Sequence, residues 1–155
     1  MHHVLGKLKN KHGFTMIEII CILVIVGIIG VFAITRMTST QDIDLASQIE
    51  VVKTHLRQAQ ARAMSSGRPW GIFFHSNKKR YYLFDDAANT TKVLLLGEKN
   101  AEVDLQQDKN SALRIDPPSG NRVTFNAYGS PGTANIVLTT NGGNITITKN
   151  TGFIP

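Results

Sequence analysis

One uninterrupted apolar segment near the N-terminus constrains this chain more than any other feature. Residues 14–35 read FTMIEIICILVIVGIIGVFAIT, and about 22 residues in an α-helix extend roughly 33 Å. That length matches the hydrocarbon core of a bilayer and exceeds the ~7–15 apolar residues of a secretory signal sequence. Three lysines precede the segment and only Arg36 follows it closely, an asymmetry that predicts a cytoplasmic N-terminus. We therefore expect a membrane-spanning helix over residues 14–36, in contact with membrane lipid.

A single carboxylate, that of Glu18, interrupts the apolar character of this segment. A carboxylate inside a membrane helix costs roughly 3 kcal/mol on insertion scales, although near the helix end it can snorkel to the interface or insert protonated. Its sequence context is more specific than its charge. Residues 13–18 read GFTMIE and follow a basic leader of residues 1–13. The leader, this hexapeptide and the apolar segment together resemble the class III leader motif of type IV pilins and type II secretion pseudopilins.

This resemblance implies two covalent modifications and one assembly contact. A prepilin peptidase would cut between Gly13 and Phe14, and the new Phe14 amine would be N-methylated. The resulting cationic amine lies one helical turn from Glu18, and helix N-termini favour anionic side chains. Within a bundle of helices in lipid, the amine of one subunit can pair with Glu18 of the next. Such pairing would fix the axial register, because only one offset satisfies both charges.

A second apolar pattern follows and predicts that the helix continues. Apolar residues recur at alternating spacings of four and three along one face, namely Leu45, Ile49, Val52, Leu56, Ala59 and Ala63. Gly67 can take the left-handed conformation that ends a helix, and Pro69 blocks its continuation. We expect one helix from Phe14 to about Ser66, weakened near residues 37–41.

After Gly67 the apolar period changes to an alternating one, which is typical of β-strands. The expected strands are residues 70–74, 80–83, 91–96, 113–115, 122–125, 134–139 and 144–148, and the polar stretch 97–111 is expected to be a long loop. The fold class is α+β, with a long N-terminal helix, half membrane-spanning and half amphipathic, packed on an antiparallel β domain. We expect a leader over residues 1–13, an assembly helix over 14–36 and a pilin-like exported domain over 37–155.

The order of elements carries a second resemblance. The helix end, LRQAQARAMSSG over residues 56–67, leads directly into strands, and the chain closes with FNAYGS (125–130) and ITITKNTG (145–152). These segments are similar to the GspH/FimT family of minor pseudopilins and minor pilins. The resemblance implies a structural subunit that helps to initiate or cap the filament of a type II secretion system or a type IV pilus.

The resemblance also implies partners and a location. The partners are the prepilin peptidase, other pilins or pseudopilins and the inner-membrane assembly platform. The location is the inner membrane, with a single pass, a cytoplasmic N-terminus and a C-terminal domain that is periplasmic or extracytoplasmic. A single-pass anchored protein that never assembles is a further alternative.

The residue types do not form a recognisable catalytic or metal site. Cys21 is the only cysteine, so no intramolecular disulfide is expected. His55 and His75 lack partners at metal-ligand spacing, and we interpret both as surface histidines. The sequence contains no nucleophile elbow, P-loop or dinucleotide-binding turn. We therefore expect no enzyme activity, no metal and no cofactor.

Nucleic-acid binding is the alternative function from a different class. Lys78, Lys79 and Arg80 precede two tyrosines, and neighbouring basic and aromatic side chains can hold a single strand. A solvated hairpin explains the same residues, and without the leader the chain has only 14 basic against 11 acidic side chains. Some FimT-like members are DNA receptors with arginines in a C-terminal GRxR-like segment, whereas residues 151–155 read TGFIP. DNA is therefore an alternative partner that we do not favour.

Overall fold

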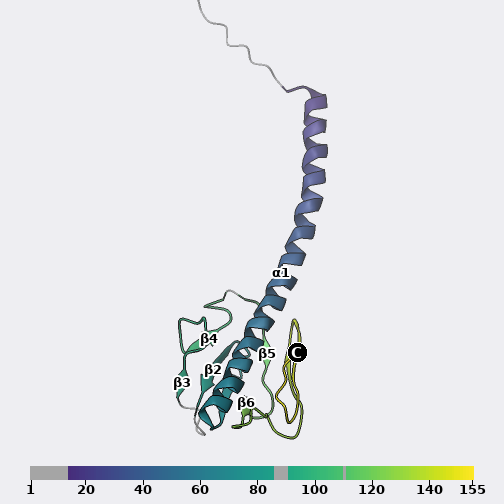
Figure 1. Cartoon of the computed structure of the whole chain (residues 1–155). Helices are drawn as coiled ribbons and strands as arrows, with labels where there is room; N and C mark the ends of the chain where they lie inside the picture. The colour runs from purple at the N-terminus through teal and green to yellow at the C-terminus, as the bar shows by residue number, and fades with distance from the viewer. Residues whose placement is uncertain (1–13, 86–90, 110) are drawn as a thin grey trace, which may run out of the picture. The chain divides into compact units, whose positions relative to one another are not determined.

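The structure, a computed structural model, describes residues 14–85, 91–109 and 111–155, apart from the side chains of residues 31–41. The chain divides into two compact units, with the boundary between Ser39 and Thr40. One helix, α1 (Met16–Ser66), contributes residues to both units (Figure 1). It begins two residues later than the sequence predicts, and its predicted end at Ser66 is confirmed. The weakening expected near residues 37–41 does not interrupt it.

The C-terminus of α1 has the geometry that its sequence predicts. Gly67 has a φ of 67°, in the left-handed region that a residue with a Cβ rarely adopts. Its N–H donates a hydrogen bond to the Ala63 carbonyl oxygen at 3.1 Å. Pro69 follows before the first strand, so the helix stops and the chain turns within three residues.

The described part of the first unit presents apolar side chains to its surroundings. Ile17, Leu23 and Ile29 are 66%, 65% and 61% exposed. Within the residues that the structure describes, no helix combines the length and the apolar character needed to cross a membrane. The membrane-spanning helix over residues 14–36 stays a prediction.

The second unit contains a five-stranded antiparallel sheet. Its strands are β1 (Trp70–Phe74), β2 (Arg80–Phe84), β3 (Lys92–Val93), β4 (Glu102–Asp104) and β6 (Arg122–Phe125). The order is β3-β2-β1-β6, and β4 pairs with β2 beside β3. The hairpin β1–β2 aligns Ile72 with Leu83, and β6 returns to β1 with Val123 opposite Ile72.

A smaller antiparallel sheet is formed by the C-terminal part of the chain. It consists of β5 (Ile115–Asp116), β7 (Ile136–Thr140) and β8 (Gly143–Ile147), in the order β5-β7-β8. A tight two-residue turn, Asn141–Gly142, connects β7 to β8 and sets Leu138 opposite Ile145. In Figure 1 this hairpin lies on the opposite side of α1 from β3 and β4.

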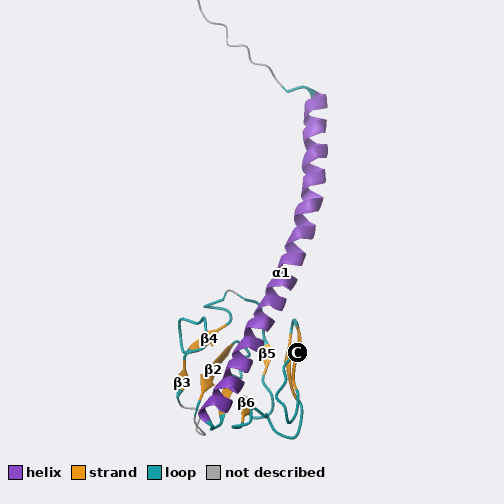
Figure 2. Ribbon diagram, in the orientation of Figure 1, coloured by secondary structure: helices purple, strands orange, loops and turns teal. Residues whose placement is uncertain are grey.

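The apolar stripe of α1 predicted from the sequence lies in the core of the second unit. Its residues from Ile49 to Ala63 are at most 8% exposed, and Leu45 packs against them. They pack against inward-facing residues of both sheets, including Ile72, Phe74, Leu83, Val123, Phe125, Leu138, Ile145 and Ile147. Figure 2 shows the end of α1 lying along these strands. The α+β class, with the end of a long helix packed on antiparallel strands, is confirmed.

Three expectations are wrong in the second unit. The polar stretch 97–111 is not a continuous loop, because Glu102–Asp104 forms β4 and pairs with β2. Glu102 and Asp104 form ion pairs at the surface, whereas Val103 between them is only 1% exposed. A single apolar residue therefore anchors the strand. His55 is not a surface residue, because its exposure is only 2%. The expected strand 91–96 is also shorter, since β3 comprises only Lys92–Val93.

Candidate functional site

The residues around the predicted processing site begin the described chain. Gly13 lies outside the described residues, and Phe14 precedes α1 with its side chain 73% exposed. The Thr15 carbonyl oxygen accepts hydrogen bonds from the N–H groups of Glu18 and Ile19 at 3.1 and 3.2 Å. Thr15 Oγ1 also accepts from the Glu18 N–H at 3.3 Å. Thr15 is therefore the N-cap of α1, and Phe14 lies outside the helix.

The sequence of residues 15–18, TMIE, already contains a signal for this cap. A Thr followed three residues later by a Glu is the sequence pattern of a capping box. Glu18 thus stands in the first turn of α1, where the helix dipole favours a negative charge. Its side chain is exposed in the single chain. The carboxylate is consequently accessible to a group from another molecule.

The basic run Lys78–Arg80 at the β1–β2 turn is largely neutralised by acidic partners. Lys78 Nζ forms an ion pair with Asp116 Oδ1. Arg80 Nε lies 2.7 Å from Asp104 Oδ2, and its Nη1 lies 4.0 Å from Glu102 Oε1. Among the described side chains, no acidic partner is found for the Lys79 ammonium group. Two of the three cations are therefore already paired with acidic side chains of the same chain.

The tyrosines that follow the basic run do not present their rings to solvent. Tyr81 is fully buried and Tyr82 is 7% exposed. The Tyr82 ring stacks on Phe73 with 5.3 Å between centroids. A nucleic-acid base requires an accessible aromatic face for stacking. The structure does not bring accessible aromatic rings and unpaired cations together at this turn.

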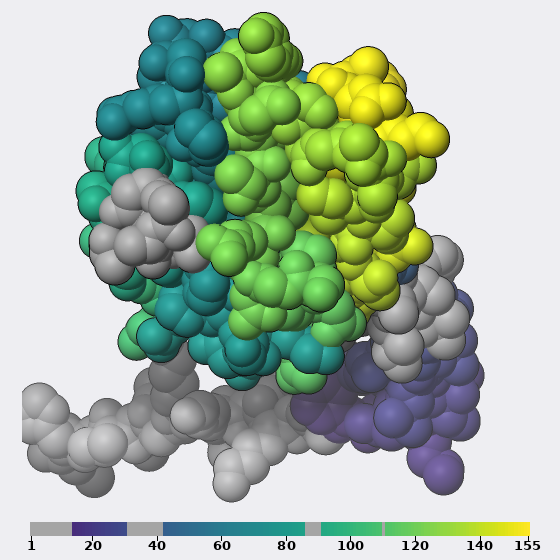
Figure 3. Space-filling view, turned by 90° about the horizontal axis from the view of Figure 1, so that it is seen from below, coloured from purple at the N-terminus to yellow at the C-terminus, as the bar shows by residue number. Residues whose placement is uncertain are grey.

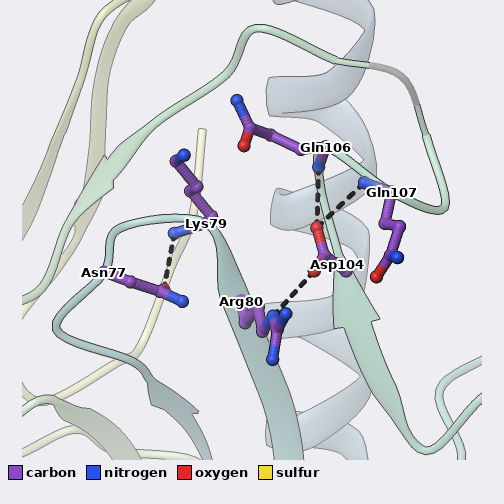
Figure 4. A pocket seen from close by; sticks show the side chains of 6 residues that line it. All are labelled: Asn77, Lys79, Arg80, Asp104, Gln106 and Gln107. Carbon is purple, nitrogen blue, oxygen red and sulfur yellow. Dashed lines mark hydrogen bonds and ion pairs between the residues drawn. The ribbon is translucent and has the colours of Figure 1, made fainter.

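A shallow hollow of about 460 Å³ lies beside this run (Figure 4). Its lining residues are Asn77, Lys79, Arg80, Asp104, Gln106 and Gln107. Asp104 Oδ1 accepts hydrogen bonds from the backbone N–H groups of Gln106 and Gln107, both at 2.9 Å. The Gln107 N–H and the Arg80 guanidinium lower the pKa of the Asp104 carboxyl, so a negative charge lies in the hollow. That charge offsets the charge of Arg80, so Arg80 is not free to bind a phosphate group.

His55 is the buried polar residue that the sequence interpretation missed. Its Nε2 lies 3.2 Å from the Leu96 carbonyl oxygen and its Nδ1 lies 2.9 Å from Tyr81 Oη. Since a carbonyl oxygen can only accept, Nε2 carries the proton and Nδ1 accepts from the tyrosine hydroxyl. Burial lowers the pKa of His55, which favours this neutral form. The spacing of His55 from Val52 and Ala59 already placed it near the apolar stripe.

His55 holds the segment between β3 and β4 against α1. Glu98 Oε1 lies 3.7 Å from His55 Nε2, and Glu98 Oε2 lies 2.8 Å from Lys109 Nζ. Glu98 is only 7% exposed at its side chain. The arrangement links α1, β2 and the 95–109 segment through one polar network. Within the described residues, no group of three or more His, Cys, Asp and Glu side chains is arranged to hold a metal ion.

Gln60 ties the C-terminal residues to α1. Its Nε2 donates to the carbonyl oxygens of Gly129 and Thr151 at 2.9 and 3.0 Å. A Cβ added to Gly152 would lie 2.1 Å from the Gly129 oxygen, so only glycine fits there. The space-filling view places the C-terminal residues (yellow) next to the segment around residue 130 (Figure 3).

Two sequence families match the chain. A model of the family described as type II transport protein GspH matches residues 48–152. A model of the prokaryotic N-terminal methylation motif matches residues 8–34. No curated protein sequence matches the chain.

Solved structures of a type IV minor pilin share the fold. The type IV minor pilin FimU of Pseudomonas aeruginosa, in space group P21, has a TM-score of 0.56 at 19% identity, covering 75% of this chain and 90% of that chain. A second crystal form of FimU has a TM-score of 0.51 at 21% identity, with 72% and 90% coverage. The minor pseudopilin EpsH of the Vibrio cholerae type 2 secretion system has a TM-score of 0.47 at 12% identity, with 72% and 94% coverage.

Proposed function

Since the chain belongs to the family of type II transport protein GspH, which comprises minor pilins and pseudopilins, we propose that it helps to initiate or cap a secretion or pilus filament. The proposal rests on one observation: a single helix joins the part of the chain that matches the methylation motif to the part that matches the GspH family. The N-terminal methylation motif covers residues 8–34, the family domain covers 48–152, and α1 spans Met16–Ser66. The proposal assigns the chain a structural role and no catalytic activity.

We propose that a prepilin peptidase cleaves between Gly13 and Phe14 and that the Phe14 amine is then methylated. The match to the methylation motif supports this proposal. The Thr15 cap supports it too, because it begins α1 at Met16 and leaves Phe14 outside the helix. Proteases act on extended backbone, and a helix that included Phe14 would have to unwind before cleavage.

The proposed assembly contact joins Glu18 of one subunit to the Phe14 amine of the next. The exposed position of Glu18 in the first turn of α1 is compatible with this contact. In lipid an unpaired carboxylate is costly, and a cation from a neighbour offsets that cost only at one axial offset. The pair would therefore set how far each subunit rises along the filament.

The proposed location is the inner membrane, with residues 14–36 spanning it, the leader in the cytoplasm and residues 37–155 on the opposite side. The charge asymmetry around the apolar segment supports this orientation. The proposed partners are the peptidase, other pilins or pseudopilins, the inner-membrane assembly platform and membrane lipid.

DNA binding is not proposed. Lys78 and Arg80 are paired with Asp116 and Asp104, which leaves Lys79 as the one cation of the run with no acidic partner among the described side chains. Electrostatic binding to phosphates requires several cations that are free of such partners. The C-terminal residues 151–155 contain no arginine.

The filament role is tested by following the full-length chain in its native host. Filaments sheared from cells should contain the chain, and its N-terminus should be N-methyl-Phe14 by mass spectrometry. In cells without the prepilin peptidase, the leader should remain and the chain should stay in the membrane fraction. Detection of an intact leader in cells with an active peptidase would contradict the proposed processing. Absence of the chain from filaments would contradict the filament role.

A further inference from the structure

The outward edge of β8 carries backbone groups for which the described part of the chain supplies no backbone partner. In the register of β7 and β8, the N–H and C=O groups of Ile145 and Ile147 face β7, so those of Asn144 and Thr146 face away from it. The hydrogen bond from the Asn141 N–H to the Arg114 carbonyl oxygen, on the other side of β7, agrees with this alternation. Within the described residues, no backbone hydrogen bond is found for the outward groups of Asn144 and Thr146.

The other edges of the two sheets are protected against pairing with foreign strands. Charged side chains stand on β3 (Lys92), β4 (Glu102 and Asp104) and β6 (Arg122), and in β5 Asp116 is followed by Pro117. Charges and prolines on edge strands prevent unwanted strand addition. β8 reads GNITI and contains neither a charge nor a proline. The sequence therefore leaves one edge open while protecting the others in the described structure.

An exposed aromatic ring lies beside this edge, and the nearest charged residue along the chain is Lys149, which follows the end of β8. The Thr148 N–H donates to the Phe153 carbonyl oxygen at 2.9 Å, which folds the C-terminal residues back beside the end of β8. The Phe153 side chain is nevertheless 63% exposed. Val137, opposite Thr146 and on the same face, is 46% exposed. An added strand would therefore lie near two exposed apolar side chains, Val137 and Phe153.

We propose that the β8 edge binds an extended, uncharged segment of a different filament subunit, which adds as a further strand of the smaller sheet. This inference rests on the proposed filament role. Strand addition supplies affinity through main-chain hydrogen bonds, and neighbouring side chains supply selectivity. The outward N–H and C=O groups of Asn144 and Thr146 would hold the segment, and Phe153 would contact its side chains.

The direction of β8 argues against a second copy of this chain as the occupant. The β7–β8 turn lies on Leu45 and Ile49, since a Cβ on Gly142 would meet both at about 3 Å. The far end of β8 leads to Thr151, whose carbonyl oxygen bonds to Gln60. β8 thus runs in the same direction as α1. Copies with parallel α1 helices cannot pair their β8 edges antiparallel, and the other sheet edges of a copy carry the charges and the proline described above.

The test compares proline at the two kinds of edge in the full-length chain. Thr146→Pro removes an outward N–H of β8 and leaves the bonds to β7 intact, a position where strands tolerate proline. Thr124→Pro is the matched control, because the register of β1 and β6 turns the Thr124 N–H away from β1 on the edge that carries Arg122. At equal membrane levels, Thr146→Pro should lower incorporation into filaments about tenfold, and Thr124→Pro should not.

Amide hydrogen exchange provides a second readout on the unmodified chain. The amides of Asn144 and Thr146 should exchange more slowly in filaments than in the chain extracted from membranes. Unchanged exchange, or wild-type incorporation of Thr146→Pro, would overturn the inference while leaving the filament role intact. Absence of the wild-type chain from filaments would overturn the filament role itself. A disulfide-linked homodimer of Thr146→Cys in a Cys21→Ser background would assign the edge to a second copy and overturn the choice of occupant.

Discussion

Glu18 is a single residue on which the proposed assembly geometry depends. Its carboxylate stands in the first turn of α1 and is exposed in the isolated chain. A carboxylate that only snorkels to the interface would be dispensable, whereas one that pairs with a neighbour's amine would be required. The two interpretations differ in the step that a substitution affects.

We expect Glu18→Ala to insert into the membrane normally, because it removes a charge, and to fail at assembly. The neighbour's amine would then lie unpaired in lipid, at a cost on the order of 3 kcal/mol. Glu18→Gln should be nearly as defective, since it keeps the shape but loses the charge. Crosslinking to partner pilins at equal membrane levels measures the loss, and Asp42→Ala serves as a control that removes an exposed carboxylate elsewhere on α1. Equal crosslinking of all variants would support the snorkelling interpretation.

His55 gives the second unit a dependence on pH. Burial lowers the pKa of His55, opposed by the Leu96 carbonyl oxygen and the Glu98 carboxylate, while Lys109 acts in the same direction as burial. Its contribution to stability is therefore complete above the unfolded pKa of about 6.5 and is lost as the pH falls toward the lower folded pKa. We expect the free energy of unfolding to decrease between pH 7.5 and 5.5, with the 95–109 segment loosening first.

The measurement is denaturant unfolding of the full-length chain in detergent at several pH values, with Trp70 fluorescence as the signal. His55→Gln should reduce the slope of stability against pH in this window, because it removes the titrating group. The carboxyl groups of Glu102 and Asp104 have lowered pKa values and therefore titrate below the window. An unchanged slope in His55→Gln would show that other groups cause the dependence.

At the scale of elements, the stability of the second unit depends on the apolar stripe of α1. Leu56 lies in the middle of this stripe and is fully buried among residues of both sheets. We expect Leu56→Ala to cost about 2–5 kcal/mol and Leu56→Asp to cost more, because the latter buries an unpaired charge. Ile43, on the same helix but 67% exposed, provides the control Ile43→Asp, which should be within about 0.5 kcal/mol of wild type. Thermal unfolding followed by Trp70 fluorescence measures the difference, and a native-like Leu56→Asp would show that the stripe is not buried.

The elements differ in how well their own sequence predicts them. The stripe of α1, the end of α1 at Ser66 and the strands β1 and β6 were predicted because their apolar periods and turn residues are local. β4 was missed because it has only one apolar residue, Val103, and because its ion-pair partners are distant in the sequence, as in Arg80–Asp104, 24 residues apart. The burial of His55 was missed for the same reason, since Tyr81 and the Leu96 carbonyl oxygen satisfy it only in the fold.

At the scale of the whole molecule, the sequence predicted the family and the fold class. It did not predict which surface groups are paired within the chain and which are free. The basic run Lys78–Arg80 reads as a cationic patch in the sequence, yet Asp116 and Asp104 neutralise two of its charges. The open edge of β8 is likewise invisible in the sequence, because it follows from register and strand order. Surfaces of this kind depend on which distant segments meet, and local patterns do not encode that.

The contacts that Gln60 and Arg57 make with the C-terminal residues affect when the chain can complete its folding during synthesis. Gln60 bonds to a residue 91 positions later in the chain, and Arg57 donates to the Ile154 carbonyl oxygen 97 positions later. During synthesis the apolar stripe of α1 is therefore made long before the strands that cover it. Contacts at such separations form slowly, and a partly made chain leaves its stripe uncovered meanwhile. The nascent subunit thus passes through an interval in which it needs protection from premature association, and that interval closes only when the last strand arrives.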